Sequence, residues 1–315
     1  MKPAPFRYER PSSLEEALRA LEEAGDEGRV LAGGQSLVPM LNMRLAAPSV
    51  LVDVNAISGL DEIATEGEGE AEGEGEGEGE GEGDRRYLVV GALARQRTLE
   101  RSALAASCCP VLPECLSVVG HVPTRNRGTV GGSIAHADPA GELPVALLAL
   151  GGEVEVAGPD GVRRIGADDL FVGFLTTSLG AGEMLVRCRF PARRGAVGSG
   201  FAEVAPRHGD FAFAIACASV ALDESGRIAG ARLALGAVAD RPLLVPAAGD
   251  VLGGSRGEEP ALRAAAAAAQ AAVDPADSLH APAGYRRHLV GVLAGRALRQ
   301  AVAKASEQLT KGGSR

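Results

Sequence analysis

The sequence predicts a fold of mixed helices and strands arranged in about two domains. The chain has 315 residues, and a single domain takes up roughly 150 residues. Some segments repeat apolar residues at helical spacing, whereas others alternate apolar and polar residues as half-buried strands do. Residues 191–200, rich in Pro, Gly and Arg, are typical of a link between two domains.

The individual elements follow from these patterns in chain order. A helix is expected over residues 12–25, where Leu and Ala recur at helical spacing and Gly25 supplies the stop. A capping box of Ser and Glu fits its start in two registers, at positions 12 and 15 or at 13 and 16. The further expected elements are strands at 29–31, 50–54 and 87–90, helices from 37 and at 98–107 and 110–119, a hairpin of 153–157 with 162–165, antiparallel strands at 211–222 and 231–238, and helices at 261–273 and 285–309.

The net charge of −9 comes from one segment. Residues 66–83 alternate Glu with Gly or Ala and hold nine of the 41 acidic residues, so the remaining 32 equal the 32 Lys and Arg. Such a tract has no apolar side chains to bury, and we expect a solvated, disordered insertion. The rest of the chain has no basic excess, which argues against nucleic-acid binding through phosphate contacts.

Other totals narrow the class of protein. The N-terminal segment lacks the apolar core and cleavage site of a signal peptide. The longest apolar stretch, residues 211–222, is far shorter than the roughly 20 residues of a membrane helix. Five cysteines, an odd number, fit free thiols in a reducing compartment, with Cys108, Cys109 and Cys115 expected in the core. We therefore expect a cytoplasmic protein without a membrane span.

Two glycine-rich loops are the main candidates for a binding site: Ala32-Gly33-Gly34-Gln35-Ser36 and Thr129-Val130-Gly131-Gly132-Ser133. Glycine allows positive φ angles and close backbone approach, and successive amide N–H groups can form an anion nest. Neither loop matches a Walker or dinucleotide-binding motif, so each taken alone is more often a tight turn. Together the two loops can hold a diphosphate from both sides.

Other segments carry weaker signals. The pair His136 and Asp138 lacks a third metal ligand, and no metal site is expected. The segment Arg125-Asn126-Arg127, before the second glycine loop, fits either a phosphate or partner contact or a solvated loop. The sequence Gly-Gly-Ser-Arg-Gly at 253–257 resembles a nucleophile elbow without the strand that must precede it, so a loop is expected there and no catalytic residue is assigned.

The chain closely resembles the flavin-binding (medium) subunits of the molybdenum hydroxylases, the carbon monoxide dehydrogenase and xanthine dehydrogenase type. The resemblance runs from SLEEALRAL through LAGGQSLVPMLNMRLAAPSVLVDVNAI and RNRGTVGGSIAHADPAGELPVALLAL to GYRRHLVGVLAGRAL. It covers nearly the whole chain outside the acidic tract and the tail. The two glycine motifs with their flanks are specific in combination.

The resemblance implies an α+β fold: a vanillyl-alcohol-oxidase-like (PCMH-type) FAD-binding region of two subdomains, followed by a C-terminal domain with a three-stranded antiparallel sheet and helices. The boundaries expected in this chain are 1–60 and 61–190 for the two FAD-binding subdomains, 191–309 for the C-terminal flavoprotein domain, and 310–315 for a frayed tail.

The resemblance also implies the site. The FAD diphosphate would lie between the two glycine loops, so the cofactor-binding residues expected are Ala32, Gly33, Gly34, Gln35, Ser36, Thr129, Val130, Gly131, Gly132, Ser133, Glu142 and Leu185. Glu142 stands where many relatives carry Asp, Gln35 where His is frequent, and Phe201 where the carbon monoxide enzymes have Tyr.

The function implied is electron transfer. FAD on this chain would receive electrons from two iron–sulfur clusters on a small subunit, a large subunit would carry molybdopterin, and the complex would be a dimer of heterotrimers. The flavin would pass the electrons to a final acceptor. Two alternatives remain open at this point: a self-sufficient flavin oxidoreductase of the same fold, and an interaction subunit without cofactor.

Overall fold

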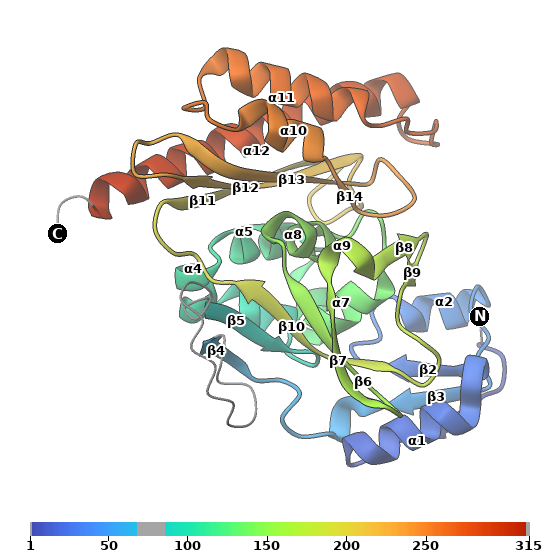
Figure 1. Cartoon of the computed structure of the whole chain (residues 1–315). Coiled ribbons are helices and arrows are strands. Elements are labelled where there is room, and N and C mark those ends of the chain that lie inside the picture. The colour runs from blue at the N-terminus through green and yellow to red at the C-terminus, as the bar shows by residue number, and fades with distance from the viewer. Residues whose placement is uncertain (1, 68–85, 313–315) are drawn as a thin grey trace.

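The computed structural model describes residues 2–67 and 86–312 (Figure 1). Most of the acidic tract therefore lies outside the described residues, as do positions 313–315 of the tail. Glu66 and Gly67 are an exception, because they form the end of a strand. The expectation of disorder was wrong for these two residues, since they pair with neighbouring strand residues 86 and 87.

The N-terminal part forms a small parallel sheet that carries the first glycine loop. Strands β1 (Arg7–Glu9), β2 (Gly28–Leu31) and β3 (Val50–Asp53) lie in the order β1-β3-β2. Helix α1 (Leu14–Ala24) precedes β2, and α2 (Leu37–Met43) follows the loop. Ser13 caps α1 by accepting a hydrogen bond from the Glu16 amide, which selects the second capping register.

The second sheet has five antiparallel strands in the order β4-β5-β10-β6-β7. Their bounds are β4 (Ile63–Gly67), β5 (Arg86–Gly91), β10 (Met184–Pro191), β6 (Glu153–Gly158) and β7 (Gly161–Gly166). The intervening helices are α3 (Gln96–Glu100), α4 (Ala103–Cys108), α5 (Val111–Val118), α6 (Val122–Arg127), α7 (Val130–His136), α8 (Glu142–Leu150) and α9 (Ala167–Leu170), with a short hairpin of β8 (Phe171–Gly173) and β9 (Thr176–Thr177). One face of the sheet joins α5, α7 and α8 in the largest core, which buries Cys109 and Cys115.

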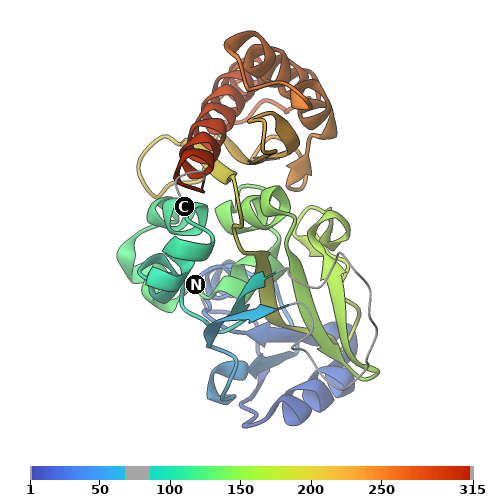
Figure 2. The same cartoon turned by 60° about the vertical axis from the view of Figure 1, so that its left-hand side comes forward.

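The C-terminal part is a separate layer of sheet and helices (Figure 2). Its strands are β11 (Val197–Val204), β12 (Ala214–Leu222), β13 (Ile228–Gly236) and β14 (Leu243–Leu244), and its helices are α10 (Pro246–Leu252), α11 (Glu259–Ala271) and α12 (Ala283–Gly312). The expected three-stranded sheet is thus extended by a fourth, two-residue strand at the edge beside β13.

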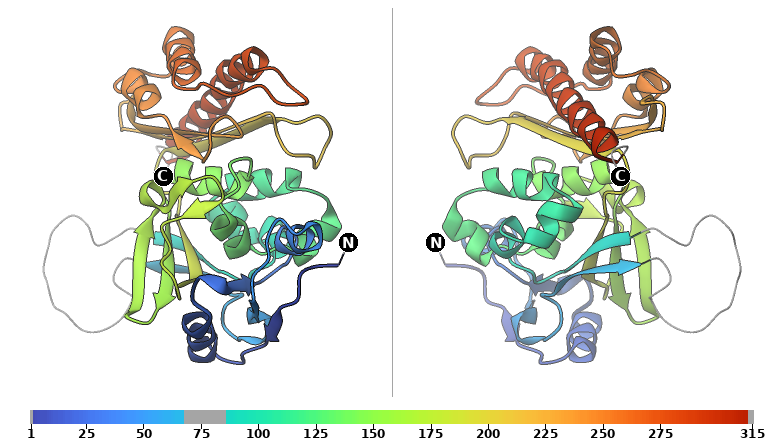
Figure 3. Two further views of the ribbon diagram at one scale, coloured as in Figure 1. Left: turned by 90° about the vertical axis from the view of Figure 1, so that its right-hand side faces the viewer. Right: turned by 90° about the vertical axis from the view of Figure 1, so that its left-hand side faces the viewer.

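The C-terminal sheet lies between two helical layers (Figure 3). Helix α12 packs so closely on β11 that a Cβ atom at Gly198 or Gly200 would lie 2.1 or 2.2 Å from a carbonyl oxygen of the helix. The opposite face rests on α5 and α8 of the preceding region. Residues 197–200 of the expected link belong to β11, and residues 310–312 of the expected frayed tail continue α12, so the sequence expectation was wrong for both segments.

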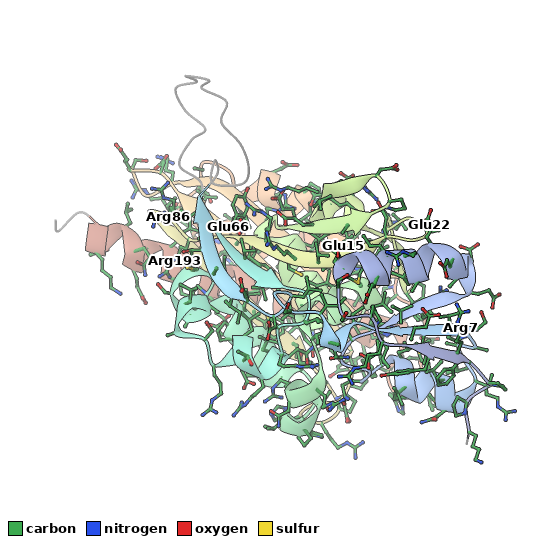
Figure 4. The ribbon with its side chains drawn as sticks, turned by 90° about the horizontal axis from the view of Figure 1, so that it is seen from below. Arg7, Glu15, Glu22, Glu66, Arg86 and Arg193 are labelled. Atoms are coloured by element: carbon green, nitrogen blue, oxygen red, sulfur yellow. The ribbon has the colours of Figure 1, made fainter. Side chains whose placement is uncertain are left out.

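An ion-pair network covers the outer face of the five-stranded sheet. Arg189, only 1% exposed, pairs with Glu66 at 2.6 Å, Glu153 at 2.9 Å and Glu155 at 3.3 Å. Its guanidinium carbon also lies 4.6 Å from the centre of the Tyr87 ring. Glu66 is the first residue of the acidic tract, and Figure 4 labels it near the end of β4. The tract therefore begins with a glutamate that has a structural partner.

We expect only the first residue of the acidic tract, Glu66, to contribute to the stability of the sheet. Replacing residues 68–85 with Asn-Gly keeps the cross-strand pair of Gly67 and Arg86 and supplies a two-residue hairpin turn. We expect the unfolding free energy, measured by urea denaturation, to change by less than about 0.5 kcal/mol. Glu66→Gln in the full chain is expected to cost more, because it weakens the Arg189 network. A loss in the turn variant that exceeds the loss in Glu66→Gln would refute this division.

Candidate functional site: a crevice between two glycine loops

The structure brings the two glycine loops into contact. A Cβ atom at Gly33 would lie 2.5 Å from the carbonyl oxygen of Arg127 and 2.8 Å from the Cα of Gly128, directly before the second loop. A Cβ atom at Gly132 would lie 3.7 Å from the Cβ of Ala32. The loops are therefore neighbours across a crevice, as the sequence predicts.

The backbone donors of the first loop are not used within the described part of the chain. Within residues 2–67 and 86–312, the N–H groups of Gly33, Gly34, Gln35 and Ser36 have no hydrogen-bond acceptor. Gly34 has a φ angle of 73°, which favours glycine. Gln35 donates through its side-chain amide to the carbonyl of Gly33 at 3.2 Å. The loop thus has the free N–H groups that an anion nest requires.

The second loop differs from this expectation. Val130 and Gly131 donate their N–H groups to the carbonyls of Ala94 and Ala92, while those of Gly132 and Ser133 donate to Thr129. No glycine in this loop has a positive φ angle. The nest interpretation was wrong for this loop, because its amides are used by the Thr129 cap of α7 and by pairing with residues 92–94. Gly131 is needed for close packing, since its Cβ would lie 2.6 Å from Ala92.

A narrow apolar cavity of about 80 Å³ lies between the loops. Four of the expected site residues line it: Ala32, Gly131, Gly132 and Leu185. Leu185 comes from β10, next to an irregularity in its pairing with β6. The cavity joins residues from the first subdomain, the second loop and the central strand of the large sheet. Of the remaining expected residues, Gly33, Gly34, Gln35, Ser36, Thr129, Val130 and Ser133 belong to the same two loops.

A polar bridge that the sequence did not reveal fixes the two loops relative to each other. The Asn55 amide donates to the carbonyl of Ala32 at 2.9 Å, which holds the first loop. Arg95 donates to the Asn55 side chain at 2.8 Å and to the Arg127 carbonyl at 2.6 Å, which holds the approach to the second loop. These two residues are the main positioning groups missed from the sequence. The only signal was Asn55 within the matched segment DVNAI.

Asp53 anchors this bridge. It accepts hydrogen bonds from the Asn55 side chain at 2.6 Å and from the Tyr8 hydroxyl at 2.5 Å. Burial raises the pKa of Asp53, but the hydrogen bonds from Tyr8 and Asn55 outweigh this effect and hold the pKa below its ordinary value. Asp53 is therefore a carboxylate at neutral pH and orients Asn55 toward the first loop.

Glu142 lies apart from the cavity, at the first position of α8. Burial, followed by the charges of Glu203 and Asp138, raises its pKa to about 8. Glu203 comes from β11 of the C-terminal sheet, so the surroundings of Glu142 include both parts of the chain. The structure thus places Glu142 outside the lining of the cavity, at the start of α8.

Several other expectations are resolved by the structure. Arg125 is buried and pairs with Glu100 at 2.8 Å, so its interpretation as a phosphate contact or solvated loop residue was wrong. His136, considered above together with Asp138, is half-buried, and this burial lowers the pKa of its imidazole. The Gly-Gly-Ser-Arg-Gly segment follows helix α10 as a loop, which agrees with the expectation.

The described residues include no group of three or more His, Cys, Asp or Glu side chains arranged to hold a metal ion. None of the helices in residues 2–67 and 86–312 has the length and apolar character needed to cross a membrane.

Comparison with known families agrees with this architecture. Residues 4–74 and 78–193 match the FAD binding domain in molybdopterin dehydrogenase, and residues 199–301 match the CO dehydrogenase flavoprotein C-terminal domain. The chain is 36% identical over 305 residues to the 6-hydroxypseudooxynicotine dehydrogenase complex subunit alpha of Paenarthrobacter nicotinovorans, covering 97% of both chains. It is 34% identical to the carbon monoxide dehydrogenase medium chain of Afipia carboxidovorans, covering 97% of this chain and 99% of that one.

Solved structures give the same answer. The reconstituted CO dehydrogenase from Oligotropha carboxidovorans superposes with a TM-score of 0.88 at 33% identity, over 96% of this chain and 100% of that one. Quinoline 2-oxidoreductase from Pseudomonas putida 86 superposes with a TM-score of 0.84 at 36% identity, over 97% of this chain and 99% of that one. The chain therefore belongs to the FAD-binding medium subunits of the molybdenum hydroxylases, a family of oxidoreductase subunits.

Proposed function

We propose that this chain is the electron-transfer subunit of a molybdenum hydroxylase and binds FAD between its two glycine loops. The observation that carries the proposal is the row of free N–H groups at Gly33, Gly34, Gln35 and Ser36, directly beside the second loop. A diphosphate needs such donors, and close backbone approach is available there. The side chain of Ser36 adds a hydroxyl donor, since it makes no capping bond to α2.

The contacts of the second loop would differ in kind from those of the first. The N–H groups of residues 130–133 already donate within the chain, so Thr129 and Ser133 would contribute hydroxyl groups while Val130, Gly131 and Gly132 shape the wall. Leu185 would supply apolar contact through the cavity, and Glu142 would contact the cofactor from the start of α8. The cavity of about 80 Å³ is smaller than a typical ligand pocket, so most of the cofactor would lie along the crevice.

The bound flavin supplies the redox chemistry, and the protein binds and orients it. The Asn55–Arg95 bridge holds the two loops at a fixed separation, which favours a rigid site. No catalytic acid or base is required of this chain for electron transfer alone.

The proposed complex contains a large molybdopterin subunit and a small subunit with two iron–sulfur clusters, as a dimer of heterotrimers in the cytoplasm. Electrons would pass from the clusters to FAD and on to a final acceptor. The names of the relatives support a multi-subunit enzyme, since one is a subunit of a dehydrogenase complex and others are medium chains.

Reconstitution with FAD tests the proposal. The purified full chain, incubated with FAD and desalted, is expected to keep about one flavin per chain, measured by its visible absorption. Flavin reduction by substrate is expected only after the large and small subunits are added. Absence of bound flavin would refute the site, and substrate-driven reduction by the chain alone would refute the electron-transfer role.

A further inference from the structure

The connection between β9 and β10, residues 178–183, forms part of the wall of the cavity between the glycine loops. It contributes Leu179 and Glu183 to the lining, and β10 continues the same wall with Leu185. The connection itself contains neither helix nor strand. Since regular backbone pairing does not hold these residues, other contacts must keep this part of the wall in place.

Glu183 is the only charged side chain among the described residues that line this cavity. Both of its oxygens accept hydrogen bonds from Arg163 of β7: Nε donates to Oε1 at 2.6 Å and Nη2 donates to Oε2 at 2.8 Å. The Gly180 N–H also donates to Oε2, at 2.5 Å. The carboxylate therefore fastens the connection to itself at Gly180 and to the neighbouring strand at Arg163.

Arg163 reaches both ends of the connection. Besides binding Glu183 at the end, its Nη2 donates to the carbonyl of Ser178 at the start, at 3.3 Å. The Ser178 N–H donates to the carbonyl of Leu170 at 2.9 Å, whereas the Glu183 N–H donates within the connection, to Gly180 at 3.2 Å. A guanidinium that forms two parallel bonds to one carboxylate fixes the orientation of both groups. Arg163 therefore ties the whole wall segment to β7.

This ion pair differs from an ordinary surface pair. Arg163 is half-exposed, but the side chain of Glu183 is only 15% exposed. Gly158 at the end of β6 leaves room for it, since a Cβ atom there would lie 2.9 Å from the Cγ of Glu183. The hydrogen bond from Arg163 lowers the pKa of Glu183 and outweighs the opposing effect of burial, so the group is a carboxylate at neutral pH.

We propose that Glu183 and Arg163 are positioning residues for FAD: their ion pair, the Arg163–Glu183 clamp, holds the 178–183 connection against the cavity and slows release of the bound cofactor. This inference rests on the proposed function. The apolar lining suits an uncharged part of FAD, and the negative charge of Glu183 disfavours a phosphate there. That agrees with a diphosphate at the free N–H groups of the first loop.

Release of FAD from the loaded full chain, followed by flavin fluorescence after dilution, tests the clamp. Arg163→Met removes every bond that the guanidinium makes, and Glu183→Gln turns an amide NH₂ group toward its donors. We expect each change to raise the dissociation rate of FAD at least about tenfold, as the loss of a charge-assisted hydrogen bond would. Arg163→Lys keeps the charge without the fork, so it is expected to recover part of the wild-type rate.

The matched control is the ion pair of Arg299 and Glu259, which joins α12 to α11 at 3.0 Å and does not line the cavity. Arg299→Met and Glu259→Gln are expected to leave the dissociation rate unchanged. Urea denaturation checks that each variant is folded in the assay, because a contact that serves stability alone would not change the rate in a folded chain. A wild-type rate in folded Arg163→Met or Glu183→Gln would overturn the clamp alone. Failure of the wild-type chain to bind FAD would overturn the proposed function together with the clamp.

Discussion

Gly33→Val is expected to abolish FAD retention and to destabilise the chain as well. The new Cβ atom would lie 2.5 Å from the carbonyl oxygen of Arg127, and no rotamer of a flexible side chain can relieve a contact with backbone. The first loop must therefore move away from the second, which breaks the crevice. We expect flavin content after desalting to fall at least about tenfold and the unfolding free energy to fall by about 1–3 kcal/mol.

A matched substitution separates this effect from the general cost of adding valine. Gly230→Val lies in β13, where an added Cβ meets nothing within 4 Å, and it is expected to leave both measurements unchanged. Normal flavin content in Gly33→Val would refute the site between the loops. A loss of flavin without any loss of stability would show that Gly33 serves cofactor approach alone, as the sequence suggested for this position.

The sequence predicts where the glycine loops lie, but it does not tell whether Gly33 is needed for cofactor approach or for packing. The glycine loops could be predicted because glycine is informative at short range, and the resemblance fixed their pairing. The sequence did not reveal why each glycine is needed. Gly34 is needed because its φ angle is positive. At Gly33 and Gly131, the Cβ atom of any other residue would collide with the backbone of another segment. Close approach depends on a partner far along the chain and leaves no local pattern.

The same limit explains the missed polar groups. Arg95 contacts Asn55 and the carbonyl of Arg127, which lie 40 and 32 residues away. Its sequence neighbourhood contains no motif, so local reasoning could not select it from the other arginines. Helix α1 was predictable for the opposite reason, because its cap, its apolar face and its stop all lie within residues 12–25.

In the acidic tract, the structural role of Glu66 cannot be read from the sequence. Glu66 looks like the other glutamates of the repeat, yet it is bound to the buried Arg189 of β10. The repeat alone gives no reason to separate one glutamate from the rest. That separation appears only when β4 is paired with β5 and the side chains on the outer face of the sheet are seen together.

Arg189→Met is expected to be the most destabilising substitution on that face. Arg189 is 1% exposed and pairs with Glu66, Glu153 and Glu155, so its removal leaves these carboxylates with only the more exposed Arg164 and Arg187 as partners. Breaking a buried ion pair by removing one partner costs about 3–5 kcal/mol. We expect a loss of this size in urea denaturation, and Arg189→Lys should lose part of it, because an ammonium group does not reproduce the fork of the guanidinium.

The neighbouring Arg164 provides the control, because it contacts Glu153 and Glu155 from β7 while its side chain remains 43% exposed. Arg164→Met is expected to cost no more than about 1 kcal/mol, as solvent-exposed pairs do. Equal losses in Arg164→Met and Arg189→Met would contradict a buried network. Combining Arg189→Met with Glu66→Gln should cost less than the sum of the two single changes, since both remove the same Glu66–Arg189 ion pair. That coupling would identify Glu66 as the residue that ties the start of the acidic tract to the body of the flavoprotein.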